Sequence, residues 1–259
     1  MEFRLIKVEQ YFKESVIKVV LNSPKANVLE AAMLSEILGV IHSLSNNKNL
    51  KLLVFEGAGK HFSFGASVPE HTKDKAAMML RSFHEVFYQL SHIGVPTMAI
   101  VRGQCLGGGM ELALFCNFII ADSTAVFGQP EILLGVLPPP ASVMLPLKVG
   151  QAYADEIALT GRSIDGKEAR AMGFVNLLCE SGQDAWEEAA KWIENHIVPK
   201  SASSLRIANF AVRNQFFRVI REDLPRMEGL YLKHLMETFD ANEGIQAFLE
   251  KRKPSWKNE

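Results

Sequence analysis

Two glutamates stand among apolar residues and next to glycines, and they are the strongest candidates for chemistry in this chain. Glu111 follows three consecutive glycines in "GQCLGGGMELALFC", and Glu131 follows Pro130 in "FGQPEILLGV". A carboxylate in apolar surroundings is costly unless it faces solvent, a partner or a cavity. Two of them beside glycine loops indicate an acid/base pair next to a site for developing negative charge. Glu111 could instead only stabilise a helix dipole from the first turn.

The three glycines before Glu111 allow more than one interpretation. A P-loop ends in Gly-Lys-Ser/Thr, but no Lys follows Gly109, and "GQCLGGG" does not match the dinucleotide pattern Gly-x-Gly-x-x-Gly. Close packing of a helix against a strand stays open, because glycine lets two backbones approach. The N–H groups at a helix start could also hold a developing negative charge.

A second loop, "GKHFSFGASVPEH" at residues 59–71, has the same small-residue character. It follows a buried strand pattern, and loops at strand ends are where α/β proteins bind ligands. His61 and His71 flank its Gly65-Ala66 pair. A surface or capping role is the simpler interpretation of these histidines, and a polar wall of a pocket is the alternative.

The elements that position these loops follow from hydrophobic periodicity. Strands are expected at residues 3–8, 15–21, 51–57, 97–101 and 175–179 and twice within 118–131, and helices at 30–45 and 74–92. Asp165, Glu168 and Gly173 predict a capped helix that ends at the glycine. Strands that alternate with helices indicate an α/β core with parallel strands. The pattern then turns helical, so we expect a core domain over 1–195 and a helical C-terminal region over 196–259.

Composition narrows the class of protein. The 259 residues are 48% hydrophobic and 22% charged, with a formal net charge of −1, which is typical of a soluble globular protein and favours neither nucleic acid nor membrane as a partner. The three cysteines fit no zinc spacing and are expected to be reduced thiols. The first residues lack the features of a signal peptide, and no apolar run reaches the length of about 18 residues that a membrane span needs. We therefore expect a cytoplasmic protein.

Five segments together resemble the enoyl-CoA hydratase/isomerase family, also called the crotonase family. They are "SPKANVL", "KHFSFGASVPE", "VRGQCLGGGMELALFCNFIIADSTAVFGQPEILLG", "LTGRSIDGKEARAMGFVN" and "EGIQAFLEKRKPSW", in family order along nearly the whole chain. The resemblance implies a spiral core of ββα turns with a helical C-terminal region, usually assembled as homotrimers or homohexamers. It also implies an acyl-CoA thioester as substrate, with coenzyme A as part of that substrate and no metal or other cofactor.

The resemblance assigns roles by motif position. It places an oxyanion hole at the backbone N–H groups of Ala66 and Gly108, where the thioester oxygen would be held. It places on Glu111 and Glu131 the two glutamates that hold the attacking water in the family's hydratases, and which of them is acid and which base stays open. Having both favours hydration or its reverse over isomerisation. Further contacts to substrate or CoA are expected from Lys25, Ala26, Phe64, Gly65, Ser67, Gly107, Pro138, Phe248 and Lys251.

Two departures from the common hydratases bear on the substrate. This chain has "LPPPASVMLP" at 137–146 in place of a glycine-rich turn, and Ser67 in place of an acidic residue. The prolines are expected to reshape the wall of the acyl pocket. Both loops are similar to those of cyclohexa-1,5-diene-1-carbonyl-CoA hydratases of anaerobic aromatic degradation, which form 6-hydroxycyclohex-1-ene-1-carbonyl-CoA. The alternatives are a straight-chain enoyl-CoA hydratase of β-oxidation, an isomerase, or a CoA- or RNA-binding module, and the two glutamates and near-neutral charge speak against the last.

Overall fold

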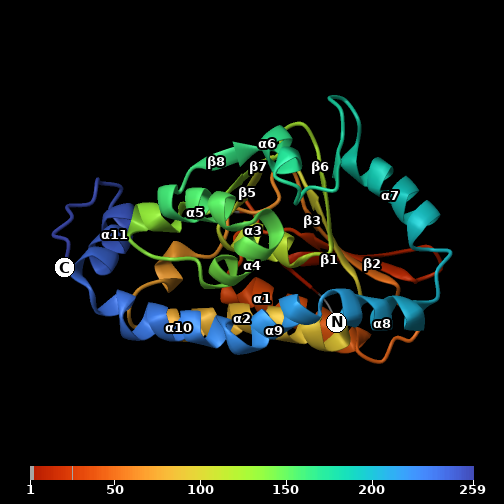
Figure 1. The fold of residues 1–259 in the computed structure, drawn as a ribbon, viewed down its shortest axis with the longest axis horizontal. Helices are drawn as coiled ribbons and strands as arrows, with labels where there is room; N and C mark the ends of the chain where they lie inside the picture. The colour runs from red at the N-terminus through yellow and green to blue at the C-terminus, as the bar shows by residue number, and fades with distance from the viewer. Residues whose placement is uncertain (1–2, 25) are drawn as a thin grey trace.

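Two sheets form the framework of the computed structural model, which describes residues 3–24 and 26–259 (Figure 1). The larger sheet has the order β1-β2-β3-β4-β6-β9, with bounds Ile6–Tyr11, Val16–Leu21, Leu52–Gly57, Thr97–Val101, Phe118–Ala121 and Leu177–Leu178. The smaller sheet has the order β5-β7-β8, with bounds Gln104–Leu106, Val126–Gly128 and Ser163–Asp165. From β2 to β9 the neighbours in the larger sheet run parallel, while β1 and β2 are antiparallel. The expected α/β core with parallel strands is confirmed.

Helices fill most of the remaining chain. They are α1 Ala31–Leu44, α2 Ala76–Ile93, α3 Gly108–Phe115, α4 Pro139–Val149, α5 Gln151–Thr160, α6 Gly166–Ala171, α7 Ala185–His196, α8 Ala202–Val212, α9 Asn214–Glu222, α10 Leu224–Lys233 and α11 Phe239–Leu249. Short 3-10 turns are η1 Val68–Glu70, η2 Pro130–Leu134 and η3 Leu235–Glu237. None of the helices in the described ranges is long and apolar enough to cross a membrane.

Most of the expected elements are present, and some of their bounds differ from the expected ones by a few residues. The helices expected at 30–45 and 74–92 are α1 and α2, and α6 carries the expected capping box, in which the Asp165 side chain accepts from the Glu168 N–H. The first strand begins at Ile6 rather than at residue 3, and the Leu5 N–H just before it donates to the Glu36 carboxylate of α1 at 2.9 Å. The short strand β8, which completes the smaller sheet beside β7, was not expected from the sequence.

Both faces of the larger sheet are covered. On one face, buried side chains of the sheet share a core with α1, α2, α3 and α9, and on the other face they pack against α7. Figure 1 shows α7 on the opposite side of the strands from α1 and α2. This explains why strands such as β3 and β4 are apolar in nearly every position rather than alternating.

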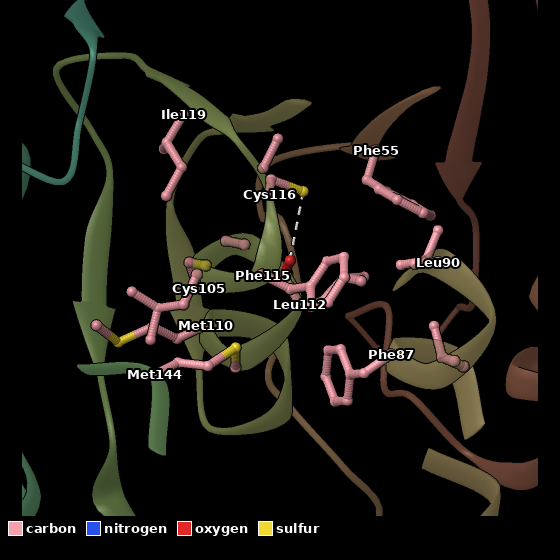
Figure 2. Close-up of a cluster of buried hydrophobic side chains, with 14 of the residues drawn as sticks. Phe55, Phe87, Leu90, Cys105, Met110, Leu112, Phe115, Cys116, Ile119 and Met144 are labelled. Carbon is pink, nitrogen blue, oxygen red and sulfur yellow. Dashed lines mark hydrogen bonds between the residues drawn. The ribbon is translucent and has the colours of Figure 1, made fainter. Parts of the chain in front are cut away.

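Helix α3 lies within this core, and all of its residues are buried. Figure 2 shows Phe115 facing Phe87 from α2, with ring centroids 5.4 Å apart. The Cys116 thiol donates to the Leu112 carbonyl at 3.4 Å (Figure 2), and all three cysteines of the chain are buried and unpaired, as expected. Close packing on every side holds α3 in one place, and with it the carboxylate of Glu111.

Candidate active site

A small cavity of about 70 Å³ lies where the two glycine-containing loops, η2 and the proline run meet beside α2 and α10. Glu111 reaches it from the first turn of α3, and Glu131 reaches it from η2. The other predicted site residues that line this cavity are Phe64, Gly65, Ala66, Gly107, Gly108 and Pro138. Residues from four separate segments, predicted to act together, therefore meet at one site.

The glycines bring two backbone segments into close contact at this cavity. At Gly65, where φ is +94°, a Cβ atom would lie 2.8 Å from the Leu106 carbonyl oxygen. At Gly108 a Cβ atom would lie 3.2 Å from the Ala66 nitrogen. Gly65 therefore needs to be glycine, while at Gly108 a side chain would require the Ala66 segment to move by a few tenths of an ångström. The close-packing interpretation of the glycines is correct, and it is compatible with a role in binding.

The same close contact leaves two backbone donors unused. Within the described ranges, neither the Ala66 N–H nor the Gly108 N–H donates to a protein acceptor. Gly108 is the first residue of α3, so its N–H has no acceptor inside the helix and lies at the positive end of the helix dipole. Two neighbouring free donors of this kind can hold one partially negative oxygen.

Glu111 is almost fully buried, with 4% of its surface exposed, and its side chain accepts from the Ala141 N–H at 2.9 Å. Burial raises the pKa of this carboxyl well above its usual range, and the nearby charge of Glu131 raises it further, while the Ala141 hydrogen bond opposes the shift. Ala141 is the third residue of α4, after Pro139 and Pro140, which have no N–H. The proline run therefore presents one backbone donor at this helix end, and Glu111 takes it.

Glu131 is partly exposed at the cavity, and burial raises its pKa to about 7. Its Oε1 lies 2.7 Å from the point where a Cβ atom of Gly107 would be. The buried side chain of Gln129 lies beside it, and with its amide nitrogen assigned toward Glu131 it donates to Oε2 at 3.0 Å and to Oε1 at 3.2 Å. With both pKa values raised, the pair can hold one proton and one negative charge near neutral pH, as an acid/base pair requires.

The remaining predicted contact residues that the structure describes are not part of this cavity wall. Lys25 is outside the described residues, while the neighbouring Ala26 has a φ of +55° and accepts from the Phe64 N–H at 3.2 Å. Ser67 stands next to Ala66 but is not part of the cavity wall. Phe248, 53% exposed at the end of α11, and Lys251, exposed just after it, are also away from the cavity, so their contacts to CoA stay predictions.

Two polar side chains at the site, Gln129 and Tyr231, were not among the predicted site residues, and for His71 the structure favours the pocket-wall alternative over a surface or capping role. Gln129 stands two residues before Glu131, and this spacing was the available signal. His71 lines the cavity, and because its Nδ1 lies 2.9 Å from the Ser67 carbonyl oxygen, Nδ1 carries the proton and Nε2 is an acceptor. Burial lowers the pKa of His71 and keeps it neutral. Tyr231 lines the cavity from α10, and nothing in its local sequence indicated this.

The fold and the paired carboxylates are compatible with an enzyme that uses acid/base chemistry, and comparison with known proteins identifies the family as one of hydratases and isomerases. The profile of the enoyl-CoA hydratase/isomerase family matches residues 11–259. The cyclohexa-1,5-dienecarbonyl-CoA hydratase of Thauera aromatica is 43% identical over 94% of this chain and 93% of that protein. A protein of Mycobacterium leprae named "Probable enoyl-CoA hydratase" is 34% identical over 99% of both. The chain belongs to the enoyl-CoA hydratase/isomerase family.

A solved structure supports the fold independently. The enoyl-CoA hydratase of Mycobacterium avium subsp. paratuberculosis matches with a TM-score of 0.86 at 22% identity, over 99% of this chain and 100% of that one. At that identity the match speaks for the fold alone. The expected crotonase-like fold with a helical C-terminal region is confirmed.

Proposed function

We propose that this protein is a hydro-lyase that adds water to cyclohexa-1,5-diene-1-carbonyl-CoA and forms 6-hydroxycyclohex-1-ene-1-carbonyl-CoA. One observation carries the proposal: two carboxylates with raised pKa values face the same cavity as two unused backbone N–H groups. The choice of a cyclic substrate is supported by the similarity to the Thauera aromatica enzyme and by the proline run, which forms part of the cavity wall.

In the proposed mechanism the thioester oxygen accepts hydrogen bonds from the N–H groups of Ala66 and Gly108. These donors draw electrons toward the oxygen and make the carbon β to the carbonyl electrophilic. The positive end of the α3 dipole stabilises the negative charge that develops there. No metal or redox group takes part in this proposal. The backbone N–H groups activate the thioester, and coenzyme A arrives as part of the substrate.

Glu111 and Glu131 hold the water in this proposal. In the cyclic substrate the carbon β to the carbonyl is C2, so the water oxygen bonds to C2 while one carboxylate takes its proton. The electrons move through C1 to the thioester oxygen and form a dienolate. The other glutamate delivers a proton to C5, the double bond moves to C1–C6, and the thioester carbonyl forms again. Renumbering this ring gives the 6-hydroxycyclohex-1-ene product, with one water consumed and every proton accounted for.

A straight-chain enoyl-CoA hydratase is the second candidate function, because the Mycobacterium leprae relative is named a probable enoyl-CoA hydratase with no cyclic acyl group in its name. The same two glutamates and two N–H donors would serve that reaction, with the proton delivered to the carbon next to the carbonyl. The difference lies in the acyl pocket, where the prolines and apolar residues such as Val136 and Leu137 form the wall.

Hydration of cyclohexa-1,5-diene-1-carbonyl-CoA, followed as a mass gain of one water, tests the proposal, with crotonyl-CoA in parallel and Glu131→Gln as a control. Turnover of the cyclic substrate alone, lost in the variant, is the expected result. Turnover of crotonyl-CoA alone would overturn the cyclic substrate but keep the two-glutamate mechanism. Turnover of neither substrate would overturn the proposed function.

We also propose that the protein works as a homotrimer or homohexamer in the cytoplasm, with the helical region 196–259 supplying contacts between subunits and to CoA. Support comes from apolar side chains exposed in that region, among them Ile207 at 71%, Val212 at 86% and Phe248 at 53%. The reduced state of the three buried cysteines fits the cytoplasm. Light scattering on the purified protein would measure the assembly, and a monomeric mass would contradict it.

A further inference from the structure

Tyr231 is a polar side chain of the active-site cavity that the proposed mechanism does not use. It comes from α10, lines the cavity that holds both glutamates, and is 1% exposed. Its hydroxyl group has no hydrogen-bond partner among the residues that the structure describes. A buried polar group without a partner calls for an explanation, because such groups are rare in folded proteins.

The surroundings of Tyr231 fix its ring and give its hydroxyl nothing to bind. The ring belongs to an apolar cluster with Met79 and Leu80 of α2, Val136 beside the proline run and Ile245 of α11. Burial raises the pKa of the phenol, and the charge of Glu131 raises it further, so the group stays protonated at any ordinary pH. Tyr231 is therefore a permanent O–H donor in an apolar wall.

The unused hydroxyl is unfavourable for the protein alone. Leaving a buried donor unpaired costs about 1–3 kcal/mol, and phenylalanine would fill nearly the same volume without that cost. The acceptor that Tyr231 lacks therefore has to come from a molecule that enters the cavity. His71, the neutral histidine of the same wall, offers an acceptor at Nε2, so it does not duplicate the donor that Tyr231 provides.

The chemistry of the reaction indicates which ligand atom that acceptor is. The dienoyl ring of the substrate has no polar atom, and its thioester oxygen is already assigned to the N–H groups of Ala66 and Gly108. The product differs by one new hydroxyl group, which originates from the water held by the glutamates. Glu131 and Tyr231 line the same small cavity, so in the proposed mechanism this oxygen is formed in the cavity that Tyr231 borders.

We propose that Tyr231 donates a hydrogen bond to the hydroxyl group of the hydroxyacyl-CoA ligand and is a specificity-determining residue for hydroxylated acyl groups. The inference rests on the proposed function for the origin of that hydroxyl group. It adds to that function a side chain that distinguishes a hydroxylated ring from a plain one. In a buried cavity, a donor that can pair only with the hydroxylated ligand favours that ligand over one that lacks the hydroxyl group.

Calorimetric binding of two ligands that differ only in this group tests the inference. The ligands are 6-hydroxycyclohex-1-ene-1-carbonyl-CoA and cyclohex-1-ene-1-carbonyl-CoA, and every protein tested also carries Glu111→Gln to suppress turnover. With Tyr231 present, we expect the hydroxylated ligand to bind about tenfold more tightly, and Tyr231→Phe to abolish this preference without weakening the plain ligand. Tyr153→Phe, the same change at a 43% exposed tyrosine on α5, is the matched control and should keep the preference.

Two results would overturn the inference: an equal loss of affinity for both ligands in Tyr231→Phe, or a preference that survives the substitution. A thermal melt of the same variant should show unchanged or raised stability, because it removes an unpaired buried group. The hydration assay on the wild-type chain judges the proposed function separately. Wild-type hydration with an intact ligand preference in Tyr231→Phe would overturn only the Tyr231 inference, whereas a lost preference without wild-type hydration would overturn only the proposed function.

Discussion

The two ends of helix α3 hold buried charges of opposite sign. At the N-terminal end, Glu111 and Glu131 lie together, no ion pair joins them to a cation of residues 3–24 or 26–259, and burial raises both pKa values. At the C-terminal end, Lys148 and Arg213 lie together, and burial lowers their pKa values to about 7 and about 10. No carboxylate of the described chain acts on either of these cations. The signs are those that a helix dipole favours, with anions at the start and cations at the end.

The two ends differ in how their charged groups are paired. The Lys148 ammonium donates to the Cys116 carbonyl at 2.7 Å, just after α3 ends, and the Arg213 guanidinium lies 3.8 Å from the centre of the Phe216 ring. Backbone and aromatic groups thus stabilise the cations, as in a structural site. The glutamates instead lie beside two unused backbone N–H donors, those of Ala66 and Gly108. Lys148 and Arg213 also line a hollow, of about 500 Å³, so neither buried charge nor a cavity by itself marks the candidate active site. What distinguishes the N-terminal end is a pair of carboxyl groups with raised pKa values next to two free backbone donors.

The largest expected difference between the two ends is in catalysis. Glu111→Gln should lower kcat for hydration about 10⁴-fold or more, because both glutamates act on one water, while Lys148→Met should change it less than about threefold. The glutamine can still accept from the Ala141 N–H, so the fold should hold. Steady-state rates would measure this, with thermal melts as folding controls. An equal loss of kcat in Glu111→Gln and Lys148→Met would contradict the proposal that only the N-terminal end of α3 is catalytic.

A glycine pair tests the geometry at the N-terminal end. Gly107→Ala places a methyl group 2.7 Å from Glu131 Oε1 at a φ of +50°, whereas Gly150→Ala, at a φ of +77°, meets nothing within 4 Å. Both should lose about 1–3 kcal/mol of stability, because their φ and ψ values lie in regions that residues other than glycine rarely adopt. Only Gly107→Ala should also lose about 100-fold in kcat, because it displaces a catalytic carboxylate. A similar kcat for the two variants would show that the position of Glu131 is not critical.

The pH dependence of kcat/KM should report the acid pair and not the cation pair. Because the pKa of Glu131 is about 7, kcat/KM should rise about tenfold per pH unit below pH 7, as the singly charged pair forms. It should level off above pH 7. The apparent pKa belongs to the pair rather than to one residue. The rise of kcat/KM around pH 7 should be unchanged in Lys148→Met, although the pKa of Lys148 is also about 7. A rise of kcat/KM around pH 4.5, or one that shifts in Lys148→Met, would contradict the assignment of this pH dependence to the two glutamates.

The smallest expected effects are on stability, and they run in opposite pH directions at the two ends. The pKa of Glu131 in the folded state is about 7, above its usual 4.5, so its stabilisation is complete below 4.5 and is lost as pH rises through 7. Glu131→Gln cannot ionise, so its free energy of unfolding should exceed the wild-type value by about 1–3 kcal/mol at pH 9 and equal it at pH 4. Urea unfolding at both pH values would show this.

Lys148 supplies the opposite case. Its pKa in the folded state, about 7, lies below its usual 10.5, so its contribution is complete above 10.5 and is lost as pH falls through 7. Lys148→Met should therefore gain stability relative to wild type as pH falls from 10.5 to 7. The same urea series measures this, and parallel pH trends in the two variants would remove the distinction between the ends of α3.

The sequence alone determined much of the fold and located the candidate site. Periodicity predicted α1, α2 and the parallel strands, because apolar spacing follows from which face of an element is buried. The capping box at Asp165 was predicted because it is a contact between near neighbours. The family resemblance, which placed Glu111, Glu131, Ala66 and Gly108 by motif, led to the family that the comparisons confirm. The catalytic roles of these residues stay predictions.

Only the tertiary structure decided which distant groups meet. The proline run, which in the sequence resembles an interruption, begins helix α4, and its first available N–H reaches Glu111. Lys148 and Arg213 gather at the other end of α3 without any local signal, and Tyr231 enters the cavity from α10. Such contacts depend on how helices far apart in sequence pack around one core, and local spacing carries no record of that packing. The sequence determined which groups could do chemistry, and the packing decided which of them lie together without a partner.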